Sequence, residues 1–245
     1  MSSQFFEKQL NSFGKESRNA ARYLYTDLAL QHGASQSKLV LERLNETPMF
    51  WLVTSAALQT AAYMSLGRIF DCKSAFNVEN LLKAAESNLQ LFQRVALMKR
   101  KLAGQTQGAE WLDDYLDNAY YPEPSDLIRI RNKVDKHRAI YNLAVKPARN
   151  KYFAHREKQD QAEVSALFGS GKVGDLVQVA TFLLQLDDIF WQLLHNGRRP
   201  VFRRVRKSVA AMRTASRTGS QAHEEVTRET YSLLKLIEEA PAWVA

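Results

Sequence analysis

Apolar residues recur along most of the chain at spacings of three and four positions, the pattern of helices that bury one face. No run of alternating β-branched and polar residues predicts a strand, and the 245 residues include only 10 glycines and 6 prolines. We therefore expect an all-α fold. The apolar runs place the expected helices at residues 4–31, 36–44, 48–70, 78–86, 88–102, 111–118, from 125 onwards, 173–194 and 221–239.

Capping signals mark several of the expected helix ends. Thr47 followed by Pro48 is typical of a helix start, because proline is favoured at the first helical position. Asn77 can cap the helix expected at 78–86. Gly33 is expected to close the first helix.

The middle of the chain is predicted to hold a long basic helix that Ser125 caps and that Pro147 interrupts or follows with a new helix. The runs 48–70 and 173–194 are the most apolar, so both are expected to be core helices. The second run carries five large apolar residues that we expect in the core or in a dimer interface: Phe182, Leu183, Leu186, Phe190 and Trp191.

Length and composition indicate a globular protein, with 45% hydrophobic residues. We expect one helical domain at residues 1–196, followed by a basic connector and an amphipathic helix at 197–245. The single cysteine, Cys72, cannot form an intramolecular disulfide. Residues 1–10 do not have the pattern of a secretory leader. The chain contains no uninterrupted run of 18 apolar residues, the length needed to span a membrane. The expected location is therefore cytoplasmic, without membrane contact.

Basic residues are concentrated in two segments, although the formal net charge is only +8. Residues 129–158 hold 10 Lys/Arg against 2 Asp/Glu, and residues 198–217 hold 8 against none. The rest of the chain is therefore acidic. This separation indicates a polyanionic partner, and we expect RNA.

One pattern of eight residues, Arg-Asn-Lys-x-x-x-His-Arg, occurs twice, at 131–138 and at 149–156. The two copies are offset by 18 residues, or about five helical turns, so they would share a face if one helix carried both. An Arg and a His held close together could cleave a phosphodiester without a metal ion.

Three histidines follow an arginine by six positions, and their neighbours differ. His137 lies among charged residues and is expected on a solvated helix face. His223 borders a Thr/Ser/Gly segment that we expect to be flexible. His155 follows Tyr-Phe-Ala, so its turn is expected to be partly buried, as a preorganised site requires.

The spacing within the second copy sets a geometric condition. Residues six apart on an ideal helix point about 120° apart. Arg149 and His155 would therefore converge only if the helix bends near Pro147, or if both lie at a seam with a second copy of the chain.

The segment Arg149-Asn150-Lys151-Tyr152-Phe153-Ala154-His155 resembles the signature of HEPN domains (higher eukaryotes and prokaryotes nucleotide-binding). In that signature an Arg, commonly followed by a polar residue, precedes a His by four to six positions. The helical layout at about 47–196, with Ser65-Leu66-Gly67-Arg68-Ile69-Phe70-Asp71 ahead of the motif, is similar to the AbiU-like abortive-infection branch. The resemblance implies a HEPN-like helical bundle with additional helices, a homodimer and, often, a metal-independent endoribonuclease of phage-defence or toxin systems.

The resemblance also implies a role for each residue that matches the motif. His155 would handle proton transfer at the ribose 2′-hydroxyl or the leaving oxygen, a role that suits an imidazole. Arg149 would stabilise charge on the phosphate oxygens, and Asn150 would orient the pair or the backbone. The expected products are a 2′,3′-cyclic phosphate and a 5′-hydroxyl.

RNA contacts are expected from both basic segments. The contacts beside the motif are Lys151, Tyr152 and Arg156, and those in the second segment are Arg203, Arg204, Arg206 and Lys207. Val201, Phe202 and Val205 could anchor the second segment. A solvated surface, or a dock for an acidic partner, is an equally open interpretation of that segment.

No metal or cofactor is predicted. Gly169-Ser170-Gly171-Lys172 lacks the first Gly and the final Ser/Thr of a phosphate-binding loop. Asp113, Asp114 and Asp117 have no His or Cys beside them, so a solvated helix face is expected there.

Two alternatives to a free ribonuclease remain open on the sequence. In one, the chain is a non-catalytic module whose basic surfaces hold RNA or an acidic protein. In the other, it is a toxin-like domain whose site is masked or modified by an antitoxin or regulatory partner.

Overall fold

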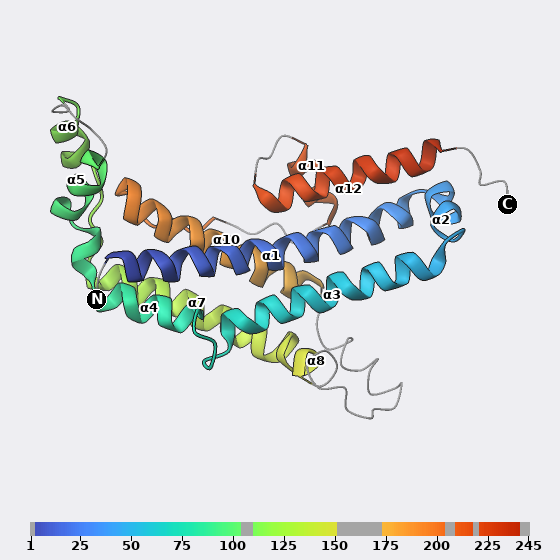
Figure 1. Ribbon diagram of the computed structural model, residues 1–245, viewed down its shortest axis with the longest axis horizontal. Coiled ribbons are helices and arrows are strands. Elements are labelled where there is room, and N and C mark those ends of the chain that lie inside the picture. The colour runs from blue at the N-terminus through green and yellow to red at the C-terminus, as the bar shows by residue number, and fades with distance from the viewer. Residues whose placement is uncertain (1–2, 104–109, 151–172, 204–208, 218–220, 241–245) are drawn as a thin grey trace. The chain divides into compact units, whose positions relative to one another are not determined.

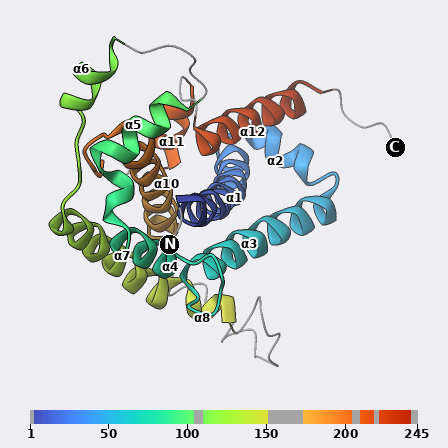
Figure 2. The same ribbon diagram turned by 60° about the vertical axis from the view of Figure 1, so that its left-hand side comes forward.

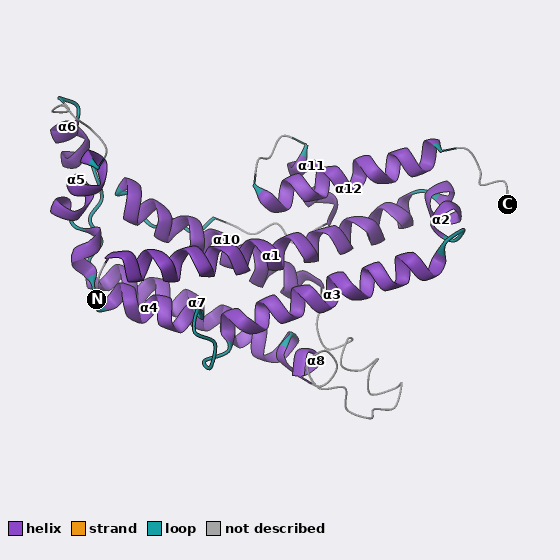
Figure 3. Ribbon diagram, viewed as in Figure 1, coloured by secondary structure: helices purple, strands orange, loops and turns teal. Residues whose placement is uncertain are grey.

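The computed structural model describes residues 3–103, 110–150, 173–203, 209–217 and 221–240 (Figure 1). Every regular element in these ranges is a helix (Figure 3), which confirms the all-α fold. No helix in them combines the length and the apolarity needed to cross a lipid bilayer. The helices are α1 (Ser3–Gln36), α2 (Lys38–Leu44), α3 (Pro48–Phe70), α4 (Val78–Glu86), the 3₁₀ helix η1 (Leu89–Phe92), α5 (Arg94–Leu102), α6 (Leu112–Asp117), α7 (Pro124–Ala144), α8 (Lys146–Ala148), α10 (Val173–Asn196), α11 (Val209–Ser216) and α12 (Ala222–Glu239).

The chain forms two compact units, and the divisions between them fall inside the long helices α1, α3, α7 and α10. The first unit comprises residues 1–16, 68–139 and 182–204, and the second comprises 17–67, 140–181 and 205–245. These units do not test whether residues 1–196 fold on their own, so the predicted domain boundary stays a prediction.

Aromatic side chains dominate the core of the first unit. Phe6 of α1 is 1% exposed and meets Phe92 and Phe190 edge to face, with ring centroids 5.3 and 6.0 Å away. Such pairs add about 0.5–1.5 kcal/mol to the burial of apolar area. Helix α1 also lies very close to α10 at Gly14, where an added Cβ would be 2.3 Å from Asp187 Oδ1.

The core of the second unit joins α12 to α1 and α2. Val40, Leu44 and Leu234 form a buried cluster there, and Trp51 of α3 packs against it. Figures 1 and 2 both show α12 beside α2 and the C-terminal part of α1. At Gly33 an added Cβ would lie 2.1 Å from Leu234 Cδ1. The expectation that Gly33 closes α1 is therefore wrong, because this glycine lies inside the helix and makes room for α12.

A buried carboxylate connects α1 to α3 in the same unit. Asp27 is 4% exposed and accepts hydrogen bonds from three neutral side chains, Ser55, Gln59 and Gln31. Burial of a charged group is costly unless it is hydrogen-bonded, so this set of donors holds the two helices in one register.

The capping signals were partly confirmed. The side chain of Asn77 accepts a hydrogen bond of 2.8 Å from the backbone N–H of Asn80, and it caps α4 as predicted. The start of α12 is a capping box formed by Gln221 and Glu224. Ser125 does not cap α7, because that helix begins at Pro124.

The prediction of one continuous helix at 88–102 is wrong. Gln93 has extended dihedral angles, φ −87 and ψ 166, and it separates η1 from α5. The apolar spacing continues across this residue, so periodicity alone gave no sign of the break. Helix α11 was missed altogether, since its sequence reads as part of the basic connector.

Helix α3 is only partly a core helix. Its C-terminal half is buried at Leu66 and Ile69, as expected. Its N-terminal half exposes Met49 (69%), Phe50 (62%), Leu52 (64%) and Val53 (61%). The prediction that the whole run is core is therefore wrong, and the second unit carries an exposed apolar face on α3.

Helix α10 matches its prediction more closely. Four of the five large apolar residues expected in the core are at most 2% exposed: Phe182, Leu183, Leu186 and Phe190. Trp191 is the exception, at 45% exposed.

Candidate functional site

The arginine of the second octapeptide follows a break between two helices. Helix α7 ends at Ala144, Val145 has φ −114 and ψ −48, and Pro147 lies in the first turn of α8. The backbone N–H of Arg149 donates to the carbonyl of Val145 at 2.9 Å, and Arg149 itself has helical dihedral angles, φ −56 and ψ −49. Pro147 therefore starts a new helix, one of the two outcomes that were predicted, and Arg149 lies close to its start.

The side chain of Arg149 lies against Gly67 of α3. An added Cβ at Gly67 would be 2.4 Å from Arg149 Nε and 2.9 Å from Cζ, a separation that real Cβ atoms do not tolerate. Only glycine gives the guanidinium this much room beside the α3 backbone. Gly67 and Arg149, one residue from each segment that carries the family resemblance, therefore lie in contact in the second unit.

The neighbour of Arg149 in the motif helps to orient it. Arg149 Nη1 donates a hydrogen bond of 3.1 Å to Asn150 Oδ1. The backbone before the pair is anchored by two fully buried residues, Val145 (0% exposed) and Ala148 (1%). Both Arg149 and Asn150 are themselves half-buried. A planar cation held in this way is suited to bind a phosphate with two hydrogen bonds.

The other predicted site residues fall partly outside the described ranges. His155, Lys151, Tyr152 and Arg156 lie in the segment 151–172, and Arg204, Arg206 and Lys207 lie in 204–208; neither segment belongs to the described residues. The convergence of Arg149 with His155 therefore stays a prediction.

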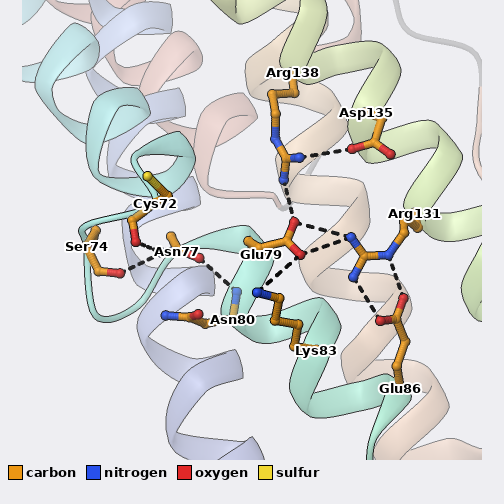
Figure 4. Close-up of polar contacts among 10 residues, drawn as sticks. All are labelled: Cys72, Ser74, Asn77, Glu79, Asn80, Lys83, Glu86, Arg131, Asp135 and Arg138. Atoms are coloured by element: carbon orange, nitrogen blue, oxygen red, sulfur yellow. Dashed lines mark hydrogen bonds and ion pairs between the residues drawn. The ribbon is translucent and has the colours of Figure 1, made fainter.

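The first octapeptide has a structural role, which Figure 4 shows in the first unit. Arg131 Nε and Nη2 bind both carboxylate oxygens of Glu86 at 2.7 and 2.8 Å, and Nη1 binds Glu79 at 3.0 Å. Arg138 bridges Glu79 at 2.9 Å and Asp135 at 3.0 Å. These ion pairs join α7 to α4.

Glu79 is the centre of this network and is ionised by it. Burial opposes the charged form of Glu79, but hydrogen bonds from Arg138 and Arg131 outweigh it and lower the pKa of the carboxyl. The pKa of Arg131 is raised, chiefly by its hydrogen bond to Glu86. Both arginines of the first copy are therefore committed to carboxylates within the fold.

The histidine of the first copy is buried, so its predicted solvated position is wrong. His137 is 8% exposed, and its ring stacks on Phe182 of α10 with centroids 3.7 Å apart and planes 3° from parallel. Its Nδ1 is 2.7 Å from the carbonyl oxygen of Lys133. The charged neighbours point elsewhere on α7, while this position faces the core.

His223 is also better ordered than its sequence suggested. It lies in the first turn of α12, with its ring edge to face against Tyr25 at 4.8 Å. Burial lowers its pKa, although the charge of Glu224 opposes the shift. This histidine is therefore a packing residue of the second unit, not part of a flexible segment.

The second basic segment is anchored by an aromatic residue, as predicted. The ring of Phe202 stacks on Phe182 at 5.5 Å, whereas Val201 is 63% exposed and Val205 lies outside the described residues. The backbone of Arg203 exchanges two hydrogen bonds with Gln185, at 2.9 and 3.1 Å. Its exposed side chain is left facing solvent.

The acidic residues of α6 and the basic residues of α12 are further charged groups on the surface. Asp113 and Asp117 pair with Arg94, and no cluster of three metal-binding side chains occurs among the described residues. Sequence reasoning missed the contribution of Arg228 and Lys235 of α12, which line a cavity together with Arg213 and Arg217. Their spacing on the amphipathic helix at 221–239 was the available signal.

Comparison with known protein families gave one result. The family model described as AbiU2, a HEPN family, matches residues 3–217, which is most of the chain. No curated protein and no solved structure matched the chain.

Proposed function

We propose that this chain, which belongs to the AbiU2 family of HEPN proteins, is a metal-independent endoribonuclease that acts in phage defence. The observation that carries the proposal is the close packing of Arg149 against Gly67, which we call the seat of Arg149. This packing holds the motif arginine in one place beside α3. Enzymes gain most from charged groups that are fixed before the reaction begins.

The proposed reaction uses the ribose of the substrate as its nucleophile. His155 removes the proton of the 2′-hydroxyl while the 2′ oxygen attacks the adjacent phosphorus. The bond from phosphorus to the 5′ oxygen breaks, and that oxygen takes up a proton. The products are a 2′,3′-cyclic phosphate and a 5′-hydroxyl, so atoms and charges balance without a metal ion.

Arg149 acts on the phosphate in this scheme. Negative charge grows on the phosphate oxygens as the 2′ oxygen attacks, and a guanidinium can donate two parallel hydrogen bonds to them. The hydrogen bond to Asn150 Oδ1 uses Nη1 and limits rotation of the guanidinium plane. In the same proposal, the RNA strand is contacted by Lys151, Tyr152, Arg156, Arg203, Arg204, Arg206 and Lys207.

A homodimer is part of the proposal, and the exposed face of α3 supports it. Met49, Leu52, Val53 and Ala56 follow the i, i+3, i+4, i+7 spacing of one helix face and are exposed. Large exposed apolar patches on a folded chain mark interaction sites. An apolar face is also complementary to itself, as a twofold interface requires.

The orientation of the two α3 helices decides whether such a dimer would join the two sites. Val53 and Gly67 are 14 residues apart on α3, which is about 21 Å along the axis. A parallel pair of α3 helices about a twofold axis would bring both Arg149 seats to the same end of the interface. An antiparallel pair would separate them by about 40 Å, so we propose the parallel arrangement.

An unrestrained ribonuclease would damage its own cell, so we also propose a regulatory or antitoxin partner. Such a partner could cover the motif or modify a residue within it. Cells should tolerate the active chain when this partner is co-expressed. They should not tolerate it when a variant of the partner that cannot bind the chain is co-expressed.

The test is an RNA cleavage assay with the full chain in excess chelator. Cutting should persist in chelator and should fall by at least about 100-fold in both His155→Ala and Arg149→Ala, with unchanged helical circular dichroism. Lys73→Ala, an exposed cation outside both basic segments, is the matched control and should cut like the wild type. Cleavage that requires a divalent cation, or that survives His155→Ala, contradicts the proposal. RNA binding without cutting, steeply weakened by salt, would instead favour the non-catalytic module.

A further inference from the structure

The second unit contains a cavity of about 490 Å³ that neither of the described motif residues, Arg149 and Asn150, lines. Its walls come from the C-terminal end of α1, the start of α2, and the helices α11 and α12. Cavities of about 300–1,000 Å³ are the size of small-molecule sites. Neither Arg149 nor Gly67 lines it.

The lining of this cavity is strongly basic. The described residues of the lining include four cations and one carboxylate, that of Glu238; the cations are Arg213, Arg217, Arg228 and Lys235. Glu238 accepts a hydrogen bond of 2.6 Å from Ser37 Oγ, which keeps that carboxylate engaged with the start of α2. Lys235 pairs with Glu239 at 3.5 Å, whereas in the described part of the chain neither Arg213 nor Arg217 is paired with a carboxylate. The cavity therefore has an excess of positive charge.

Two of the arginines are held in place by neighbouring groups. The guanidinium of Arg213 lies over the ring of Tyr231, 4.6 Å from its centroid. The hydroxyl of Tyr231 is in turn hydrogen-bonded to His32 Nδ1 at 2.7 Å. Arg228 Nη1 donates to the carbonyl oxygen of Ser216 at 2.8 Å, which ties α12 to the end of α11. Cations that are fixed in advance lose less entropy when an anion binds.

From this charge and geometry we propose that the cavity binds a phosphate-bearing ligand of nucleotide size. The arginine forks match the oxygens of a phosphate group, and the volume leaves room for a nucleoside attached to it. A free nucleotide and the 5′-phosphorylated end of an RNA share this chemistry. A ligand held between α11 and α12 would stabilise the packing of both helices on α1 and α2.

Among the described residues, the cavity and the family motif have no side chain in common. Residues matched by the family model end at 217, so α11 lies within the match and α12 lies beyond it. The wall that carries Arg228, Tyr231 and Lys235 is therefore supplied by a part of the chain that the family model does not describe. The position of α12 depends on Gly33, where a Cβ would collide with Leu234.

Isothermal titration of the full chain tests the proposal with three probes: ATP, a 5′-phosphorylated RNA hexamer and the same hexamer with a 5′-hydroxyl. Inorganic phosphate serves as the reference for a bare anion. ATP should bind at least about tenfold more tightly than inorganic phosphate if the nucleoside occupies the cavity. Tight binding of the 5′-phosphorylated hexamer but not of ATP would assign the site to RNA ends.

The variant that tests the site is Arg213→Ala/Arg217→Ala, in which both side chains are exposed and the fold should persist. Affinity for the binding probe should fall by at least about tenfold. The matched control is Lys73→Ala/Lys99→Ala, which removes the same charge from exposed positions of the first unit. An equal loss of affinity in both double variants would overturn the proposal, because it would reveal general charge attraction. Failure of every probe to bind would overturn it as well. RNA cleavage is measured separately with His155→Ala, so the ribonuclease proposal can fail without affecting this one.

Discussion

The guanidinium of Arg149 occupies the space that a side chain at Gly67 would need: an added Cβ there would be 2.4 Å from Arg149 Nε. The relationship connects the motif to a helix more than 80 positions earlier in the chain. It also makes the place of the motif arginine depend on a single missing methyl group.

Replacing Gly67 with alanine should therefore move Arg149 and impair RNA cleavage. We expect a loss of about 10–100-fold in kcat/KM, since misplacement of a catalytic group by about 1 Å can cost about 100-fold. The measurement is the cleavage rate of Gly67→Ala compared with that of the wild type.

Gly174 in α10 provides the matched control for that variant. Nothing lies within 4 Å of a Cβ at Gly174, so Gly174→Ala should leave cleavage unchanged. If Gly67→Ala cuts RNA at the wild-type rate, the seat of Arg149 is not part of the active site.

A charged residue placed in the exposed apolar face of α3 should disrupt the proposed dimer. Leu52→Asp should shift the chain from dimer to monomer in sedimentation velocity, because a carboxylate cannot be buried unpaired in an interface. Leu236→Asp on α12 is the matched control, since Leu236 is 65% exposed and Leu52 is 64% exposed. A wild-type chain that is monomeric at every concentration would contradict the proposed dimer.

The first octapeptide should prove essential to stability and not to the chemistry. His137→Ala removes a ring that stacks on Phe182 and leaves a gap in the core, which should lower the free energy of unfolding by about 2–4 kcal/mol. Urea unfolding measures the loss. Cleavage per folded molecule should stay at the wild-type level, and a specific loss of activity in the folded variant would show that the first copy takes part in the reaction.

The ion pairs around Glu79 predict a dependence of stability on pH. The folded-state pKa of Glu79 is lower than its ordinary value of 4.5, so its carboxylate stabilises the fold above about pH 4.5. That contribution is lost as the pH falls through the lower, folded-state pKa. In Glu79→Gln the free energy of unfolding should fall less as the pH drops below about 4.5. At pH 7 it should be lower than in the wild type by about 1–3 kcal/mol, because Arg131 and Arg138 lose a charged partner. An unchanged slope of unfolding free energy with pH would contradict this role.

Local patterns in the sequence were enough for the class of fold and for most helix ends. Helical periodicity and caps such as Asn77 act within four residues along the chain, so no distant contact is needed to read them. The family signature at 149–155 is local in the same sense. The misjudged end of α1 has a tertiary cause: Gly33 would end a helix in isolation, but here it allows Leu234 of a distant helix to approach.

The sequence by itself therefore determined that the chain is helical, where its positive charge lies and which motif it carries. Only the tertiary structure showed that the arginines of the two octapeptides lie in different surroundings. Arg131 binds Glu79 and Glu86 of α4, whereas Arg149 donates to Asn150 and lies against Gly67 of α3. The same holds for the exposed half of α3 and for the basic cavity, because burial and pairing depend on residues that lie far apart in the chain and are brought together only by folding.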